Sequence, residues 1–293
     1  MNLVVRLKQL NEIKYLSQLG IDVFCFDTRY TAKKINEFDI EAIKLAKKQV
    51  SELNKKIYVL INKMIHELDL VDLENYLNDL KKIKIDGIII NDLTVYVIAK
   101  KLRMENLIIY QPGTFNTDTY SKNYFSNKNI LGITLSRELT LEEIKKISEE
   151  ISTLDLSLII HGYLDMFYSK RKLISRYLEY KKITGKKLVN NYDLRLNEEI
   201  RPNDYYPILE DEFGTHIFRS KKLISIDEIT DLKQTINTFF IERIFMSDQE
   251  YFDAVKLYTN KLNKSEFLDK YKDYDSGFYY RRTEKVKGES NEN

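Results

Sequence analysis

The sequence is poor in the residues that build disulfides, thiolate metal sites and flexible linkers. Cys25 is the only cysteine among the 293 residues, so this chain alone can form neither an internal disulfide nor a multi-thiolate metal site. Because Cys25 lies within the apolar run DVFCF, we expect an inert thiol in the core. With only three prolines and nine glycines, long disordered linkers are not expected either.

Membrane-spanning and secretory segments are missing as well. No apolar run approaches the roughly 20 residues that a helix needs to cross a bilayer. The first residues, MNLVVRLKQLNEIKYL, lack the uninterrupted apolar stretch and the small-residue cleavage site of a signal peptide. We therefore expect a cytoplasmic protein with no membrane partner. Its 43% hydrophobic content is sufficient for a full core, in one large domain or in two smaller ones.

Short apolar runs rich in β-branched residues alternate with amphipathic helical segments along the chain. The runs cover residues 2–7, 22–26, 56–61, 86–90, 107–110, 130–135 and 156–160. Continuous apolar strands separated by helices are typical of a parallel sheet that is covered on both faces. With an eighth strand at 238–244, the pattern predicts an α/β fold, a (β/α)8 TIM-like barrel.

The long segment between the seventh and eighth predicted strands indicates an insertion into this barrel. We expect residues 1–160 and 223–282 to form the barrel, residues 161–222 to form a basic and aromatic insertion with helical parts, and residues 283–293 to form a flexible tail. Within the insertion, the segment YPILEDEFGTHIFRS predicts a β-hairpin that turns at Phe213 and Gly214.

Charge is concentrated in this insertion. The net charge of the chain is only +2, but residues 161–195 hold nine lysines or arginines against three acids, so the remainder is acidic. Basic groups attract phosphates, and the aromatic residues between them can stack on exposed bases. The nucleic-acid-binding candidates are Lys170, Arg171, Lys172, Arg176 and Tyr168. The alternative is a solvated helix face with its tyrosines packed inward.

Polar or ionisable residues follow nearly every predicted strand. In a TIM barrel the chemistry lies at the C-terminal ends of the strands, whereas residues within the strands fill the core. The strand-end residues are Asp27, Thr28, Arg29, Asn62, Asn91, Asp92, Gln111, Ser136, Arg137, Glu138, His161, Glu242 and Arg243. The catalytic candidates among them are His161, Glu138, Arg137, Gln111, Asp92 and Glu242. Next to His161, Gly162 would let a ligand or another backbone approach closely.

Each of these candidates also has a structural interpretation. Asp92 precedes a helical segment and is equally suited to be its N-cap. Arg137 and Glu138 are able to pair with each other or with neighbouring helices, although the helix that follows has a capping box of its own. His161 is alternatively a core histidine with satisfied hydrogen bonds, and Glu242 a partner for a basic residue across the barrel.

Two stretches resemble the signature blocks of a known family. GITLSRELTLEEIKKI (132–147) and IIHGYLDMFYSKRKLIS (159–175) are similar to the blocks of the collagenase-like peptidase family, number thirty-two among peptidases of unknown catalytic type. Weaker similarity at residues 85–93, 205–223 and 240–246 extends the resemblance over nearly the whole chain.

The departures from the family pattern concern its cysteines. Asp165 stands where the first family cysteine falls and Lys172 where the second falls, and residues 185–196, the region of the other two, contain none. In members that keep all four, these thiolates resemble an iron–sulfur ligand set, which needs soft sulfur donors. The resemblance therefore implies no iron–sulfur cluster and no other metal or cofactor in this chain.

Relatives in this family are implicated in RNA modification. The resemblance implies 5-hydroxylation of a pyrimidine, including the wobble uridine of tRNA, with prephenate as an implied substrate. Some bacteria divide this task between two short paralogous chains, and a short chain without cluster cysteines resembles one of such a pair. We therefore expect tRNA as a partner, together with a cysteine-bearing paralogous subunit or a second copy in a homodimer.

Two other functions stay open. Peptidase activity requires an activated nucleophile or a metal-bound water. The sequence has no HExxH motif, only three histidines (His66, His161 and His216) and no cysteine outside the predicted core strand. A paired-carboxylate mechanism remains compatible with the sequence. The third function is that of a non-catalytic scaffold for a cysteine-bearing partner.

Overall fold

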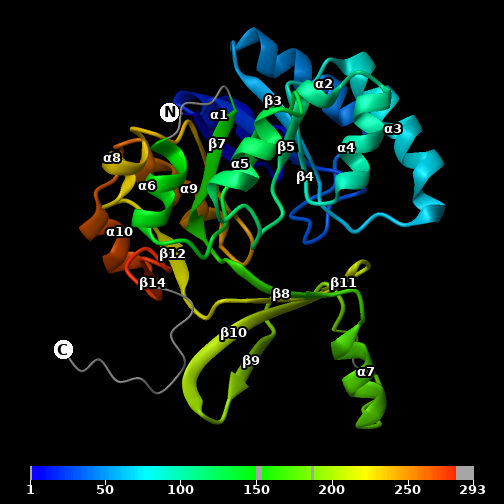
Figure 1. Cartoon of the computed structure of the whole chain (residues 1–293). Coiled ribbons are helices and arrows are strands. Elements are labelled where there is room, and N and C mark those ends of the chain that lie inside the picture. The colour runs from blue at the N-terminus through cyan, green and yellow to red at the C-terminus, as the bar shows by residue number, and fades with distance from the viewer. Residues whose placement is uncertain (1, 150–153, 186–187, 282–293) are drawn as a thin grey trace.

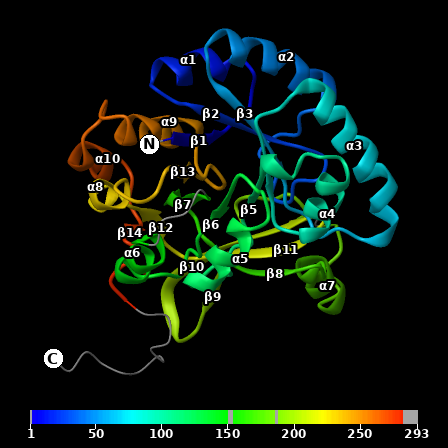
Figure 2. The ribbon, with the colours of Figure 1, turned by 45° about the horizontal axis from the view of Figure 1, so that its top comes forward.

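Eight parallel strands close into a barrel, which confirms the predicted fold class. The computed structural model describes residues 2–149, 154–185 and 188–281. The barrel strands are β1 (Asn2–Arg6), β2 (Val23–Asp27), β3 (Lys56–Ile61), β4 (Gly87–Ile90), β5 (Ile108–Tyr110), β6 (Gly132–Thr134), β7 (Asp155–Gly162) and β13 (Thr238–Ile241). Strand β13 pairs in parallel with both β1 and β7, so the ring is complete (Figures 1 and 2).

Helices surround the barrel on its outer side (Figure 2). They are α1 (Glu12–Gln18), α2 (Ile40–Glu52), α3 (Leu70–Ile83), α4 (Leu93–Lys101), α5 (Thr119–Ser126), α6 (Leu141–Glu149), α8 (Ile229–Leu232), α9 (Asp248–Tyr258) and α10 (Lys264–Lys270), with 3₁₀ turns η1 (Glu67–Asp69) and η2 (Glu105–Leu107). Helix α2 illustrates why they form, since Asp39 caps its first turn by accepting from the N–H of Ala42. Its buried residues Ile43, Ala46 and Val50 form one apolar stripe against the strands. None of the described helices combines the length and hydrophobicity that crossing a bilayer requires.

Alternation along the strands separates two apolar layers. One set of strand residues packs outward against the helices, while a smaller set fills the interior of the barrel. The interior set is Val4, Val23, Cys25, Tyr58, Leu60, Ile89, Ile109 and Phe240. Cys25 is thus a buried core thiol, as predicted, and its burial raises its pKa well above the ordinary value.

The chain between β7 and β12 (Lys222–Ile224) forms a separate antiparallel sheet below the barrel mouth (Figure 1). Its strands are β8 (Asp165–Ser169), β9 (Arg195–Glu198), β10 (Arg201–Asp211) and β11 (Gly214–Phe218), in the order β8-β11-β10-β9, and helix α7 (Leu173–Tyr180) extends from it. The predicted hairpin is β10 and β11, but its two-residue turn is Glu212 and Phe213, one residue earlier than predicted. The division of the chain into domains stays a prediction, and the tail at 283–293 lies outside the described residues.

A β-bulge determines which way His161 points. Phe240 of β13 pairs with Ile159 of β7, but the next residue, Ile241, pairs with His161, so Ile160 is an extra residue. A shift of one residue moves a side chain to the opposite face of a strand. His161 consequently lies in the outer layer, where its ring contacts Tyr258, Phe267 and Tyr274 at centroid distances of 5.5, 5.6 and 5.0 Å.

Backbone of neighbouring segments packs closely around Gly162, at the end of β7. Strand β12 pairs antiparallel with the end of β7, and β14 (Tyr274–Asp275) pairs with β12. Gly162 has a φ of +102°, and a Cβ there would lie 2.9 Å from the carbonyl oxygen of Glu242. The close approach that the sequence suggested is therefore made by backbone of the same chain.

Burial of His161 predicts a specific dependence of stability on pH. Desolvation, with Lys222 nearby, lowers the pKa of His161 from 6.5 to about 3. Below about pH 6.5 the unfolded chain binds a proton that the folded chain does not. Above that pH, the neutral, buried His161 makes its full contribution to the free energy of unfolding. This contribution is lost as the pH falls toward 3, at roughly 1.4 kcal/mol per pH unit. Urea unfolding of the wild type and of His161→Phe between pH 7 and pH 4 measures the difference, because all other titrating groups are common to both. If the free energies of unfolding of the two proteins change in parallel over this pH range, the lowered pKa of His161 is contradicted.

Candidate functional site

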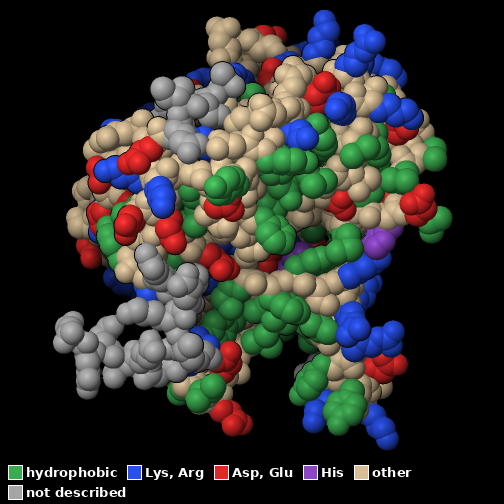
Figure 3. Space-filling view, viewed as in Figure 1, with side chains coloured by type: hydrophobic (Ala, Val, Ile, Leu, Met, Phe, Trp, Pro, Cys, Tyr) green, Lys and Arg blue, Asp and Glu red, His purple; other side chains and the backbone are tan. Residues whose placement is uncertain are grey.

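A cleft of about 590 Å³ lies between the C-terminal mouth of the barrel and the inserted sheet. Figure 3 shows the molecule hollowed there, with histidine side chains coming into view along the hollow. Residues from both parts line the cleft: Ala32, Lys33, Asn62, Met64, Asn91, Asp92, Leu93, Tyr110, Pro112, Thr114, Phe115 and Arg137 from the barrel, and Asp165, Met166, Phe167, Tyr168 and His216 from the insertion. In TIM barrels this is the end at which ligands bind.

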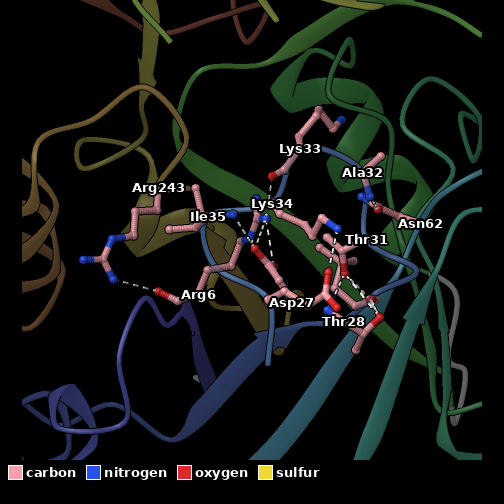
Figure 4. A network of polar contacts seen from close by, with 12 residues as sticks. Arg6, Asp27, Thr28, Thr31, Ala32, Lys33, Lys34, Ile35, Asn62 and Arg243 are labelled. Atoms are coloured by element: carbon pink, nitrogen blue, oxygen red, sulfur yellow. Dashed lines mark hydrogen bonds and ion pairs between the residues drawn. The ribbon is translucent and has the colours of Figure 1, made fainter. Parts of the chain in front are cut away.

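A buried arginine organises the barrel side of this region. Arg6, on β1, donates from Nε and Nη2 to the carboxylate of Asp27 at 2.7 to 3.0 Å, and both side chains are buried (Figure 4). Arg6 Nη2 also donates to the carbonyl of Lys33 at 2.9 Å, and Asp27 accepts from the N–H of Ile35 at 2.6 Å. Such charge-assisted pairs are strong and geometrically specific. They hold the loop after β2 against the barrel mouth.

Further hydrogen bonds fix the same loop, residues 28–38 (Figure 4). The N–H of Thr28 donates to Thr31 Oγ1 at 2.7 Å, and Thr28 Oγ1 donates to the carbonyl of Leu60 at 2.9 Å. The N–H of Ala32 donates to Asn62 Oδ1 at 2.8 Å. The loop then turns through Lys33, which has a left-handed φ of +59°. This turn directs Lys33 toward the insertion.

Lys33 joins the barrel to the insertion. Its Nζ forms an ion pair with Asp165, at the start of β8, and its backbone N–H donates to Asp211 Oδ2, at the end of β10, at 2.8 Å. Desolvation alone would raise the pKa of the buried Asp165 carboxyl. Lys33, with smaller effects of His216 and Arg137, instead holds the pKa of Asp165 well below its ordinary value. Asp165 is therefore ionised at neutral pH.

His216 lies between the two aspartates and is uncharged at neutral pH. Its ring stacks on Tyr168 at a centroid distance of 4.8 Å, with Nδ1 3.7 Å from Asp165 Oδ2 and Nε2 3.8 Å from Asp211 Oδ2. Burial lowers the pKa of His216, and the nearby Lys33 also disfavours the imidazolium, whereas the aspartates partly offset both effects. A neutral imidazole has one donor and one acceptor to offer.

Several buried polar atoms at the cleft lack a hydrogen-bond partner among the described residues. They are Arg137 Nε, Asp165 Oδ1, His216 Nδ1 and His216 Nε2. Buried polar atoms are nearly always paired, so a cluster of unpaired ones indicates a place that a ligand or water completes. The guanidinium of Arg137 lies against Gly113, where a Cβ would come within 2.3 Å of Nη2. The cleft is therefore the candidate functional site.

The predicted catalytic residues divide into three groups. Arg137 and Asp92 line the cleft, and Asp92 also caps α4 by accepting from the N–H of Thr94 at 2.9 Å. Gln111 and Glu242 contact polar neighbours at the barrel mouth, Gln111 through Thr134 Oγ1 at 3.2 Å and Glu242 through Arg6 at 3.2 Å.

Gln111 and Glu242 do not line the cleft, and neither do the last two predicted residues, His161 and Glu138. His161 lies in the outer layer because of the bulge in β7, so its predicted place at the mouth is not the one observed. Glu138 is half-buried and its N–H bonds Ser136 Oγ at 3.2 Å, but it does not line the cleft. Lys33 and His216 were not predicted, since Lys33 lies six residues beyond the end of β2 and His216 lies within a strand of the insertion. The two residues are recognised as parts of the site by their contacts across the cleft. These contacts exist only in the folded chain.

The predicted nucleic-acid-binding residues lie on the insertion. Tyr168 lines the cleft, and its hydroxyl donates to the carbonyl of Phe213 at 2.9 Å. Lys170 is close to His66 Nε2 in an adjoining hollow of about 520 Å³. Arg171, Lys172 and Arg176 line a further hollow of about 650 Å³ at the start of α7. The tyrosines of α7 are exposed, which contradicts the alternative in which they pack inward.

The positions of the missing family cysteines do not suit an iron–sulfur cluster. Asp165 is buried and paired with Lys33, whereas Lys172 is an exposed cation that lines a different hollow. Neither side chain supplies a thiolate, and such clusters are held by soft sulfur ligands. Within residues 2–149, 154–185 and 188–281, no three or more His, Cys, Asp or Glu side chains are arranged so that they could hold a metal ion.

Comparisons with known proteins agree with the fold and with the resemblance. A sequence model of peptidase family U32 matches residues 8–286. The tRNA hydroxylation protein P2 of Bacillus subtilis (strain 168) is 27% identical over 295 residues, covering 93% of this chain and 95% of that protein. The tRNA hydroxylation protein P of Escherichia coli (strain K12) is 26% identical over 80% of this chain, which spans 61% of that protein. The solved structure of the U32 peptidase Mk0906 has a TM-score of 0.50 at 11% identity, covering 82% of this chain and 92% of that one, and shows the shared fold.

Removing the Lys33 cation tests the junction between barrel and insertion. In Lys33→Met, Asp165 is left as an unpaired buried charge, so the free energy of unfolding should fall by about 3 to 5 kcal/mol. The matched control is Lys34→Met, whose partners Glu37 and Glu212 are exposed, and it should cost less than about 1 kcal/mol. The double variant Lys33→Met with Asp165→Leu should recover most of the loss. Urea unfolding measures all three, and equal effects of the two single variants would refute the role of Lys33.

Proposed function

The chain belongs to peptidase family U32, and we propose that it is a component of tRNA modification that hydroxylates carbon five of the wobble uridine. Relatives named for tRNA hydroxylation match it, one of them over 93% of the chain. The observation that carries the proposal is the cleft, where buried polar atoms that have no partner in the described part of the chain lie at the barrel mouth beside a basic segment. A cytoplasmic location, where tRNA is present, belongs to the same proposal.

The polar atoms of the cleft match the edge of an extruded pyrimidine. Arg137 Nε needs an acceptor and Asp165 Oδ1 needs a donor, and a uracil ring offers both through a carbonyl oxygen and its N3–H. The amide side chains of Asn62 and Asn91 lie in the same cleft. Enzymes that modify a base read its edge in a closed pocket after taking it out of the stack. Arg137 is also the cation available to a small organic acid, and prephenate stays the proposed small substrate.

A path of adjoining hollows, lined by cations and also by carboxylates, leads from the cleft to the start of α7. The cleft and the 520 Å³ hollow share Met64 and Tyr168, and that hollow shares Lys170 with the 650 Å³ hollow beyond it. The cations along this path are Lys63, Lys170, Arg171, Lys172 and Arg176, and the carboxylates are Glu67, Asp69, Glu179 and Glu212. Lys63 pairs with Asp69 and Arg176 with Glu179, which leaves cations concentrated at Lys170, Arg171 and Lys172. Such a path can follow the phosphates of an RNA strand whose target base occupies the cleft.

Peptide hydrolysis is supported less well by the same geometry. Asp165 and Asp211 flank His216, but Lys33 contacts both carboxylates and holds the pKa of Asp165 low. Two carboxylates act as an acid and base pair when they share a proton, which a neighbouring ammonium group opposes. The peptidase alternative therefore rests on names, those of the family and of a relative called an uncharacterized protease, and not on this geometry.

We further propose that the chain works with a second, cysteine-bearing chain of the same family. Asp165 and Lys172 replace two of the four cysteines that the family resemblance associates with a cluster, so a partner would have to supply those thiolates. The scaffold alternative and a homodimer are the other outcomes that co-purification distinguishes. If the pair is the active form, purification of this chain should recover the paralogue, and activity should appear only when both chains are present.

The RNA-binding surface can be tested by neutralising it. Replacing Lys170, Arg171, Lys172 and Arg176 by alanine should weaken binding of unmodified tRNA. It should also reduce the slope of log Kd against log salt concentration by up to about 3, because each lost phosphate contact removes one released counterion. Filter binding at several salt concentrations measures both quantities.

A control with the same change in charge separates this surface from net charge. It replaces exposed lysines of the outer helices α2, α3 and α4, namely Lys44, Lys48, Lys82 and Lys100. The control should retain most of its affinity and its salt slope. Equal losses in both variants, or unchanged binding in the first, would count against the proposed surface.

A further inference from the structure

A second aromatic pocket adjoins the cleft on the side of α5. It has a volume of about 550 Å³ and shares Tyr110 and Phe115 with the cleft. The remaining aromatic residues that line it are Tyr120, Tyr124 and Phe125. A ligand that is too long for the cleft can therefore continue directly into this pocket, past the ring of Phe115.

The rings of this pocket are unusually exposed. Phe115, Tyr120 and Tyr124 have 68%, 84% and 57% of their surface accessible. Figure 3 shows hydrophobic side chains gathered over α5, directly above the hollow. Clusters of large exposed rings around a concave site are typical of binding surfaces.

Buried polar contacts hold these rings in place. Asn116 is buried with a left-handed φ of +66°, and its Nδ2 donates to the carbonyl of Thr134 at 2.9 Å. Asp118 caps α5 by accepting from the N–H of Ser121 at 2.8 Å. The buried Lys122 donates to the carbonyl of Ile147 at 3.0 Å. Because Asn116 is anchored inward, its neighbour Phe115 is directed outward on a fixed backbone.

We propose that this pocket stacks the unpaired base next to the one that enters the cleft, an inference that rests on the proposed function. Aromatic faces accept any base, and each stack contributes substantially to the affinity for single strands. Lys128 Nζ lies 4.3 Å from the ring centroid of Tyr124, where it can meet the phosphate of that nucleotide. Thr117 adds a hydroxyl group to the lining, whereas the Ser121 hydroxyl donates to Asp118, whose carboxylate also lines the pocket and is held by this bond and by the N–H of Ser121. The flat rings beside a cation and a hydroxyl fit a nucleotide better than an aliphatic protein surface.

The test combines a protein change with an RNA change. The protein variant is Tyr120→Ala with Tyr124→Ala, and the matched control is Tyr120→Phe with Tyr124→Phe, which keeps both rings. The probes are a hairpin RNA with a uridine in its unpaired loop and the same RNA with abasic residues on both sides of that uridine. Fluorescence anisotropy at fixed salt measures the affinities. The thermal unfolding of each variant checks that the exposed positions leave the fold unchanged.

The losses of RNA-binding free energy caused by the alanine variant and by the abasic RNA should not be additive. The alanine variant should bind the intact hairpin about tenfold more weakly than the wild type. The abasic RNA should weaken wild-type binding by a similar factor and should have little further effect on the alanine variant. The phenylalanine variant should behave as the wild type.

Other outcomes overturn the inference in distinguishable ways. Additive losses, or unchanged RNA affinity in the alanine variant, exclude base stacking here. Unchanged RNA affinity together with loss of a co-purifying paralogue assigns the pocket to a protein partner. If the variant lacking the four basic residues also binds RNA normally, the proposed function itself fails. If that variant loses binding while the tyrosine pair has no effect, only the stacking pocket is refuted.

Discussion

The ion pair between Lys33 and Asp165 is the contact on which the cleft depends. It joins residues 132 positions apart in sequence, one in a barrel loop and one at the start of the insertion. The same lysine also binds Asp211 through its backbone, so one residue holds two strands of the inserted sheet over the barrel mouth. Behind it, Arg6 and Asp27 fix the loop from which Lys33 projects. The shape of the site thus follows from a chain of buried charges that begins inside the barrel.

This arrangement also sets the protonation states in the cleft. Lys33 keeps Asp165 ionised and disfavours a charge on His216, while Arg137 supplies a second cation from the barrel side. The site therefore contains a hydrogen-bond donor, an acceptor and a neutral imidazole. Such a set is suited to holding a polar ring and a small acid in place. In the proposed function, the cations at the start of α7 and the aromatic rings beside the cleft hold a strand of RNA.

Much of the fold follows from sequence periodicity, but the site follows from it only in part. The apolar runs predict the barrel because their spacing leaves room for one helix between each pair of successive strands. The eighth strand, β13, could be recognised in the same way beyond the insertion. His161 could not be placed correctly, because one bulged residue at Ile160 reverses the face on which it lies. Strands β8 and β9 lack the alternation of a half-buried strand, since the residues of β9 are all exposed. Lys33 and His216 acquire their roles from contacts that no local pattern encodes.

The most direct test is the modified-nucleoside profile of tRNA from a strain that lacks the gene. We predict that 5-hydroxylated uridine derivatives are lost, that the wild-type gene and Lys34→Met restore them, and that Lys33→Met does not. Hydroxylated uridine that persists in the deletion strain, with no related gene to supply it, would contradict the proposed function. Full restoration by Lys33→Met would contradict the dependence of the site on the ion pair.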